Sequence, residues 1–159
     1  MKRSLPVLLA LVAAIPALAE EKPLSLPFTW SAQDLVVLDA GGDNKAALTR
    51  SELVMTGTAG TPFDDLVGSC LMLSHFNPKT PDQYDASGDC MFTNASGDRI
   101  FERFEEANGK GKGKLSAGTG GLAGLTAEYT YEGAWHGSPD AVRNAGTGLK
   151  TGTYVKGGS

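Results

Sequence analysis

Turn-forming residues recur along the second half of the chain at the spacing of consecutive hairpins, and this spacing constrains the fold more than any other feature. Residues 77–81 include two prolines, which cannot donate hydrogen bonds to a sheet, and residues 94–98 surround Gly97, for which we expect a left-handed conformation. The segments 69–76, 84–93 and 99–107 between these turns have the composition of strands. We therefore predict an all-β fold, an antiparallel meander closed into a small barrel that leaves no exposed sheet edge.

The clearest predicted strand is the segment 126–132. Tyr129 and Tyr131 alternate there with polar residues, so that one face is aromatic and the other faces water. Further strands are predicted at 35–39 and 152–155, and another begins at 114–117. Residues 20–27 are interpreted as a polar, proline-bearing lead-in, and residues 47–56 fit either a strand or a short helix.

The two cysteines lie on neighbouring predicted strands. If Cys70 and Cys90 face each other, the segment between them is centred on Thr80, where the prolines already predict a turn. A cross-strand disulfide fits this register, and closing a loop of about 20 residues would contribute about 3 kcal/mol by chain entropy. A pair of buried free thiols is the alternative. Neither cysteine has the CxxC spacing of a redox or haem-attachment site.

The first nineteen residues have the pattern of a cleavable signal peptide. Lys2 and Arg3 precede an apolar stretch, and Ala17-Leu18-Ala19 offers a small-residue cleavage site. An apolar run of about a dozen residues is shorter than the roughly 20 that a spanning helix needs, and no later segment is long and apolar enough to cross a membrane. We expect residues 1–19 to be removed and residues 20–159 to form a single β-barrel domain that is periplasmic or secreted.

The exported domain is acidic. Loss of Lys2 and Arg3 changes the formal net charge from −4 to −6, because no acidic residue precedes Glu20. The basic cluster Lys110, Lys112 and Lys114 alternates with glycines, which predicts a solvated hairpin tip at 108–113. Nucleic-acid binding is therefore not expected, because it needs clustered positive charge against phosphates.

Candidate site residues are few. His75 is expected opposite Asp85 on the proposed register, a pair that suits either an oriented acid or base or a hydrogen bond across a hairpin. Tyr129, Tyr131 and Trp135 are aromatic residues suited to the mouth of a pocket or to a core. No metal-ligand spacing links the two histidines with the cysteines, and residues 118–121 lack the Gly-Lys-Ser/Thr end of a phosphate-binding loop, so no metal or cofactor is predicted.

Two motifs resemble a known family. The run GTGGLAGLTAEYTY at 118–131 is similar to the Gly-Thr-Gly-Lys-aromatic-x-Gly-x-x-Gly-x-Gly-Thr-Tyr run of small bacterial secreted proteins related to the allene oxide cyclase-like barrels, and FTNASGDR at 92–99 resembles the Phe-Thr-Asp-x-Asp-Gly-Asp-Lys hairpin that precedes it. The chain departs from the pattern at Gly121, Leu122 and Ala127, where the family has Lys, an aromatic residue and Gly. The resemblance implies an eight-stranded, calycin-like barrel with a central cavity, and it carries over no catalytic residue.

These observations together predict a function of the binding type. We expect an exported, non-enzymatic barrel that binds a small apolar or amphipathic ligand, with His75, Tyr129, Tyr131 and Trp135 as candidate ligand-binding residues. The alternatives are an isomerase or cyclase acting on a lipid-like substrate, with His75, Asp85 and the Tyr129/Tyr131 face as candidates, and a purely structural or protein-binding barrel. The oligomeric state is left open.

Overall fold

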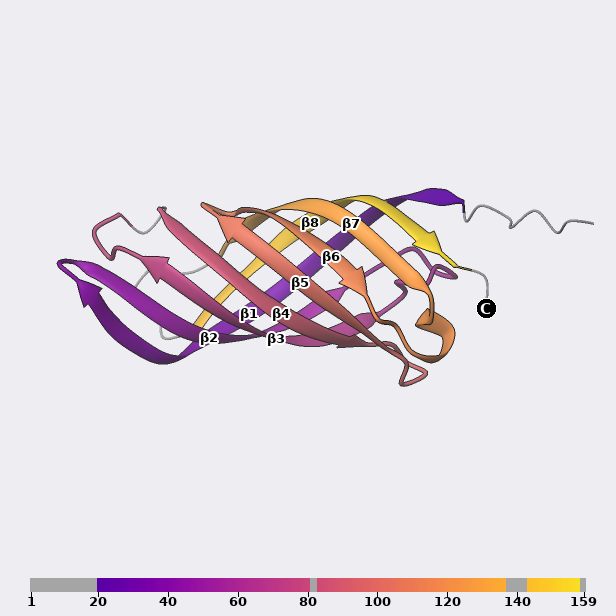
Figure 1. Cartoon of the computed structure of the whole chain (residues 1–159), viewed down its shortest axis with the longest axis horizontal. Helices are drawn as coiled ribbons and strands as arrows, with labels where there is room; N and C mark the ends of the chain where they lie inside the picture. Colours follow the sequence, from indigo (N-terminus) through magenta and orange to yellow (C-terminus); the bar gives the residue numbers. More distant parts are fainter. Residues whose placement is uncertain (1–19, 81–82, 137–142, 158–159) are drawn as a thin grey trace, which may run out of the picture.

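Eight antiparallel strands form a closed barrel in which each strand pairs with its neighbours in the chain and the last pairs with the first (Figure 1). The computed structural model describes residues 20–80, 83–136 and 143–157. The predicted signal peptide lies outside the described residues. The strands are β1 (Glu21–Gly41), β2 (Asn44–Met55), β3 (Leu66–Phe76), β4 (Tyr84–Thr93), β5 (Arg99–Ala107), β6 (Lys110–Ser116), β7 (Leu125–Trp135) and β8 (Arg143–Lys156).

The predicted all-β meander is confirmed, and two of its strands have the predicted bounds. β4 and β5 begin and end where the turn residues indicated, and Gly97 between them has φ of 84°. Residues 47–56, which fitted either a strand or a helix, fall almost wholly within β2. Within the described part of the chain the one helical element is the 3₁₀ turn Gly120–Leu122, and no helix there is long and apolar enough to cross a membrane.

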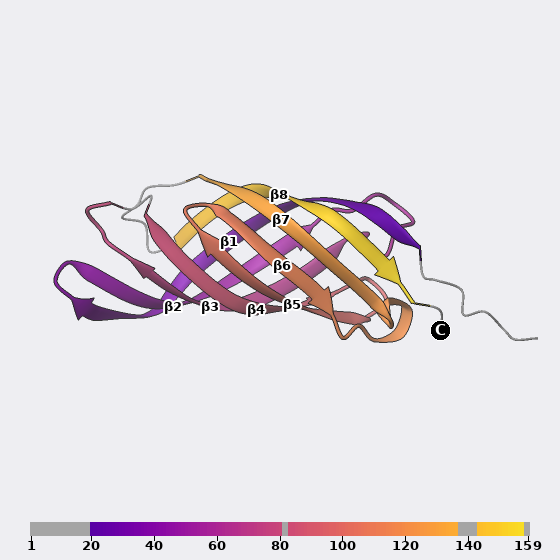
Figure 2. The same cartoon turned by 45° about the horizontal axis from the view of Figure 1, so that its top comes forward.

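The prediction of a lead-in at 20–27 was wrong, because β1 already begins at Glu21 and pairs with β8 across this whole segment. Leu24, Leu26 and Phe28 point into the barrel at every second position, and the intervening residues are exposed. Two prolines obscured this alternation in the sequence. Closure of the barrel explains why β1 extends to Glu21, since this part of β1 pairs with the second edge of β8 (Figure 2).

The prediction of a hairpin tip at 108–113 was also wrong. The turn is confined to Asn108 and Gly109, which have φ of 54° and 77°, and β6 starts at Lys110. The three lysines of β6 point outward and form ion pairs with glutamates of β5 and β7, namely Lys110 with Glu132, Lys112 with Glu105 and Lys114 with Glu128.

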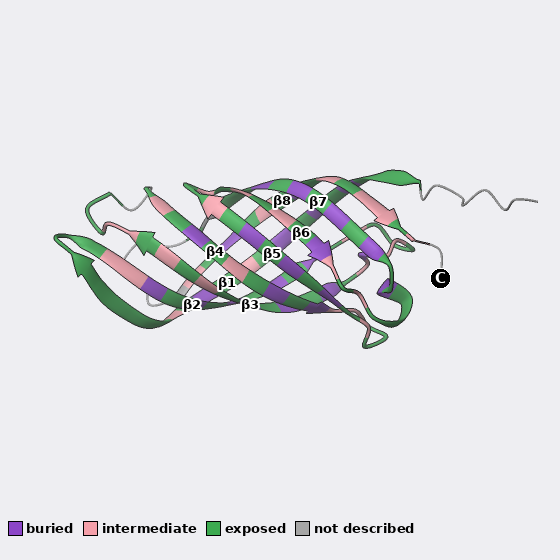
Figure 3. Cartoon of the chain, viewed as in Figure 1, coloured by how far each residue is buried: buried purple, intermediate pink, exposed green. Residues whose placement is uncertain are grey.

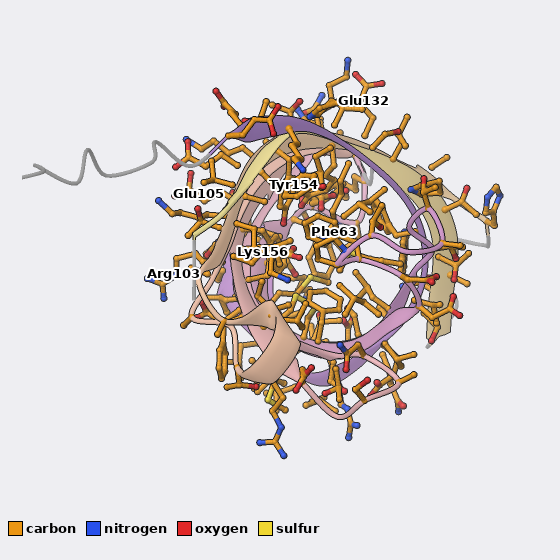
Figure 4. The ribbon with its side chains drawn as sticks, turned by 90° about the vertical axis from the view of Figure 1, so that its right-hand side faces the viewer. Phe63, Arg103, Glu105, Glu132, Tyr154 and Lys156 are labelled. Carbon is orange, nitrogen blue, oxygen red and sulfur yellow. A yellow bond between two sulfur atoms is a disulfide. The ribbon has the colours of Figure 1, made fainter. Side chains whose placement is uncertain are left out.

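Alternate residues of the strands are buried, as Figure 3 shows by the bands of purple and green. One half of the interior is packed solid by side chains from β1 to β7, including Met55, Phe92 and Leu115. Phe63, from the loop between β2 and β3, lies inside this end of the barrel with its ring centroid 5.0 Å from that of Tyr154 (Figure 4). Leu122 is buried in the same cluster, so side chains close the end of the barrel that contains Phe63.

A disulfide joins β3 to β4 inside the barrel. Cys70 and Cys90 occupy opposite positions of the two strands, both are buried, and their sulfurs are bonded. The predicted pairing is therefore confirmed. A disulfide of this kind indicates an oxidising compartment outside the cytoplasm.

Several inward-facing glycines make room for aromatic rings of neighbouring strands. A Cβ on Gly148 would lie 2.2 Å from Phe28 Cζ, and one on Gly113 would lie 2.3 Å from the Tyr129 hydroxyl oxygen. At these distances a Cβ would force the ring or the strand to shift. The glycines of β6 and β8 therefore let large rings lie against the inner surface of the sheet.

Replacing Gly148 by alanine is expected to lower the free energy of unfolding by about 1–3 kcal/mol, because the new methyl group overpacks against Phe28. The matched control is Gly133→Ala on the paired position of β7, where a Cβ would lie 4.0 Å from its nearest atoms. The control should change stability by less than about 0.5 kcal/mol. Urea unfolding of both variants measures the difference, and equal losses would contradict this account of the glycines.

Candidate functional site

The half of the barrel opposite Phe63 is hollow. It contains a cavity of about 270 Å³ lined by inward-facing residues of β1 to β5, β7 and β8. Its apolar walls include aromatic and aliphatic side chains, among them Phe28, Trp30, Leu53, Met72, Phe76 and Phe104. Polar lining side chains on β1, β2, β5 and β8 include Asp34, Thr49, Ser51, Glu102, Glu106, Asn144 and Lys150.

A buried ion pair lies at the boundary between the packed half and the cavity. Lys150 of β8 donates a hydrogen bond of 2.5 Å to Glu102 Oε2 of β5, and each side chain is 2% exposed. The ammonium also lies 3.3 Å from the Tyr129 hydroxyl oxygen. Removing either partner would leave the other charge buried without compensation, a change that typically costs several kcal/mol.

Four aromatic rings surround the same ammonium. Lys150 Nζ lies 4.8 Å from the ring centroid of Tyr129, 5.3 Å from Phe92, 5.5 Å from Phe28 and 6.0 Å from Tyr131. Aromatic faces at these distances stabilise a cation. The interior thus holds its positive charge with one carboxylate and a cage of π-systems.

A second carboxylate lies further along β5 toward the open half. Glu106 accepts a hydrogen bond of 2.7 Å from the Tyr131 hydroxyl through Oε2, and its Oε1 accepts one from the Tyr84 hydroxyl. Asp34, nearer the end of β1, accepts a hydrogen bond of 2.6 Å from Thr49. Asn144 also lines the cavity, and its buried Oδ1 has no hydrogen-bond partner among the described residues.

These surroundings shift the protonation of the buried groups. Burial raises the pKa of Tyr129, Tyr131 and Tyr84 above the ordinary phenol value, and the negative charges of Glu102 and Glu106 raise it further. Burial lowers the pKa of Lys150, and the adjacent Glu102 opposes that shift. The three phenols therefore act as hydrogen-bond donors.

The structure separates the candidate residues found in the sequence. Tyr131 lines the cavity, and Tyr129 lies beneath it against Lys150. His75 does pair with Asp85 at 3.1 Å, but both side chains are exposed on the outer face of β3 and β4, away from the cavity. The side chain of Trp135 lies outside the described residues. The ligand-binding roles of these residues stay predictions.

The sequence analysis missed the polar lining of the cavity, including its charged residues Glu102, Glu106 and Lys150. A signal for the glutamates was present, because period two in β5 places both on the same face as the buried Ile100 and Phe104. The inward neighbours of Lys150 in β8 are Gly148 and Gly152. The sequence there has no alternation of apolar and polar residues that would predict an inward side chain. Among the described residues no cluster of three or more His, Cys, Asp or Glu side chains is arranged to hold a metal ion.

The tyrosines give a pH-dependent test of this site. An unfolded chain ionises its phenols near pH 10, whereas the folded barrel keeps Tyr129 and Tyr131 protonated, so stability should fall as the pH rises above about 10, by up to about 1.4 kcal/mol per unit for each of them. Phenolate absorbance should therefore appear together with the loss of the β circular-dichroism signal. Ionisation of all four tyrosines in a barrel that remains folded would contradict the buried network.

Comparisons with known proteins give a relation of fold only. No family model matches the chain, and no curated protein matches it in sequence. The chain is similar to a solved structure, that of the pterocarpan synthase dirigent protein GePTS1, with a TM-score of 0.51 and 8% sequence identity over 88% of this chain and 94% of that one. At this level of identity the likeness supports the barrel architecture.

Proposed function

We propose that this protein is a non-enzymatic β-barrel that holds a small apolar or amphipathic molecule in its cavity. The observation that carries the proposal is the hollow half of the barrel, with aromatic walls above a floor of converging polar groups. Pockets of this composition, mostly apolar with a few placed polar side chains, are the usual form of small-molecule sites.

The size of the cavity sets the size of the ligand. A cavity of about 150 Å³ accommodates benzene, and the cavity here is about 270 Å³. The proposed ligand is therefore a single ring with a short chain, or an aliphatic molecule of similar volume. Its apolar body would contact Phe28, Trp30 and Phe104, and its polar end would reach the groups on β5 and β8.

We place the protein outside the cytoplasm, in the periplasm or secreted. The Cys70–Cys90 disulfide supports an oxidising compartment, and the signal-peptide pattern of residues 1–19 supports export. The likeness of residues 92–99 and 118–131 to secreted allene oxide cyclase-like barrels supports the same placement.

An isomerase or cyclase is the second candidate. Glu106 and the Tyr131 hydroxyl lie 2.7 Å apart at the cavity wall, which is a geometry available to acid–base chemistry. The dirigent protein of similar fold is described as a pterocarpan synthase. His75 and Asp85 would not serve a substrate in the cavity, because they lie outside the barrel.

A purely structural or protein-binding barrel would leave the cavity without a ligand.

Native mass spectrometry of the protein purified from its own host tests the binding proposal. We expect an added mass that is released on denaturation as a small apolar or amphipathic molecule, unchanged in structure. Ala86→Leu, which fills the cavity wall, should abolish the added mass, whereas Ser87→Leu on the outer face of the same strand should keep it. Protein without bound ligand, or equal retention by both variants, would contradict the proposal. Conversion of the ligand into a product would favour the enzyme.

A further inference from the structure

We propose that the cavity selects ligands that carry a positive charge, namely organic ammonium ions with an aromatic or short aliphatic body. This inference rests on the proposed binding function, which by itself leaves the charge of the ligand open. It is carried by the balance of charges around the cavity and by the way the barrel holds its own internal cation.

The cavity lining carries more negative than positive side chains. Among the described residues, Asp34, Glu102 and Glu106 line it together with one basic residue, Lys150. Lys150 is held by Glu102 at 2.5 Å. Among the side chains that the structure describes, which do not include that of Arg143, no ion pair joins Asp34 or Glu106 to a basic group. Two carboxylates at the cavity wall therefore lack a countercharge from the described part of the chain.

Glu106 is fixed in place but is not saturated. The hydroxyl groups of Tyr84 and Tyr131 each donate a hydrogen bond to one of its oxygens. A carboxylate offers about four lone-pair sites, so further acceptor capacity remains. The phenols supply hydrogen bonds without positive charge, so the carboxylate is positioned and still able to bind a charged donor.

The floor of the cavity shows how this interior accommodates a cation. There the Lys150 ammonium combines one carboxylate with four aromatic rings. Above this floor, the cavity wall has the same combination of a carboxylate, Glu106, and aromatic side chains, Tyr131 and Phe104. No lysine fills this upper level, because the next inward positions of β8 are Gly148 and Gly146. A ligand ammonium bound beside Glu106 would have surroundings like those of Lys150 at the floor.

Ligands of other charge would be disfavoured by the same groups. An anion would be repelled by the charges of Asp34 and Glu106 at the cavity wall. A neutral molecule would displace water from Glu106 without replacing the lost solvation by an opposite charge. An ammonium ion both neutralises the carboxylate and contacts the ring faces.

A matched series of three probes tests this selectivity: phenylpropylamine, phenylpropanol and phenylpropanoate, titrated into the protein by calorimetry at pH 7 and low salt. We expect the amine to bind at least about tenfold more tightly than the alcohol, and the carboxylate to bind most weakly. Glu106→Gln should bring the affinity for the amine down to that for the alcohol. Glu105→Gln, on the exposed face of the same strand, should leave the order unchanged.

The outcomes separate the two proposals. If the alcohol or the carboxylate binds as tightly as the amine, or if Glu106→Gln keeps the preference, cation selectivity is overturned and the binding function stands. If none of the three probes binds, the binding function itself is contradicted. Should Glu106→Gln fail to fold, the order of the probes on the unaltered protein and on Asp34→Asn decides in its place.

Discussion

The ion pair between Lys150 and Glu102 determines how the interior of this barrel is organised. Both side chains are almost fully buried, and they lie where the packed half of the interior meets the cavity. Two opposite charges in such a place must stay together, since either alone would be strongly destabilising. The pair joins β5 to β8 across the interior and gives the cavity a polar floor. The phenols of Tyr129 and Tyr131 and the rings around Lys150 are arranged about this pair.

The cavity exists because the chain uses different residues along the two halves of its strands. Toward Phe63 the inward positions carry large apolar side chains that meet in the centre. Toward the other end they include Ala32, Ser51 and Ala86, which are too short to fill the interior. The glycines of β6 and β8 add to this effect by letting aromatic rings lie against the sheet. The wall is thus lined by ring faces, and the volume inside is left for a ligand.

Much of the fold followed from the sequence, because turns and alternation are local signals. The prolines near Thr80 set the hairpin of β3 and β4, and the Asn94–Asp98 turn set that of β4 and β5. The turn centred on Thr80 also predicted the register of Cys70 with Cys90. The first half of β6 was missed because its inward positions are Gly111 and Gly113, whose role depends on Tyr129 and Tyr131 of the neighbouring strand. The floor of the site was missed for a related reason. Glu102 and Lys150 are 48 residues apart, and only closure of the barrel brings them into contact.

A double-mutant cycle on Lys150 and Glu102, followed by urea unfolding, tests this account most directly. Lys150→Met and Glu102→Leu should each lower the free energy of unfolding by about 3–5 kcal/mol, because each leaves one buried charge alone. The double variant should lose much less than the sum of the two, since it removes both charges together. Single losses below about 1 kcal/mol that simply add in the double variant would show that the two charges are not paired inside the barrel.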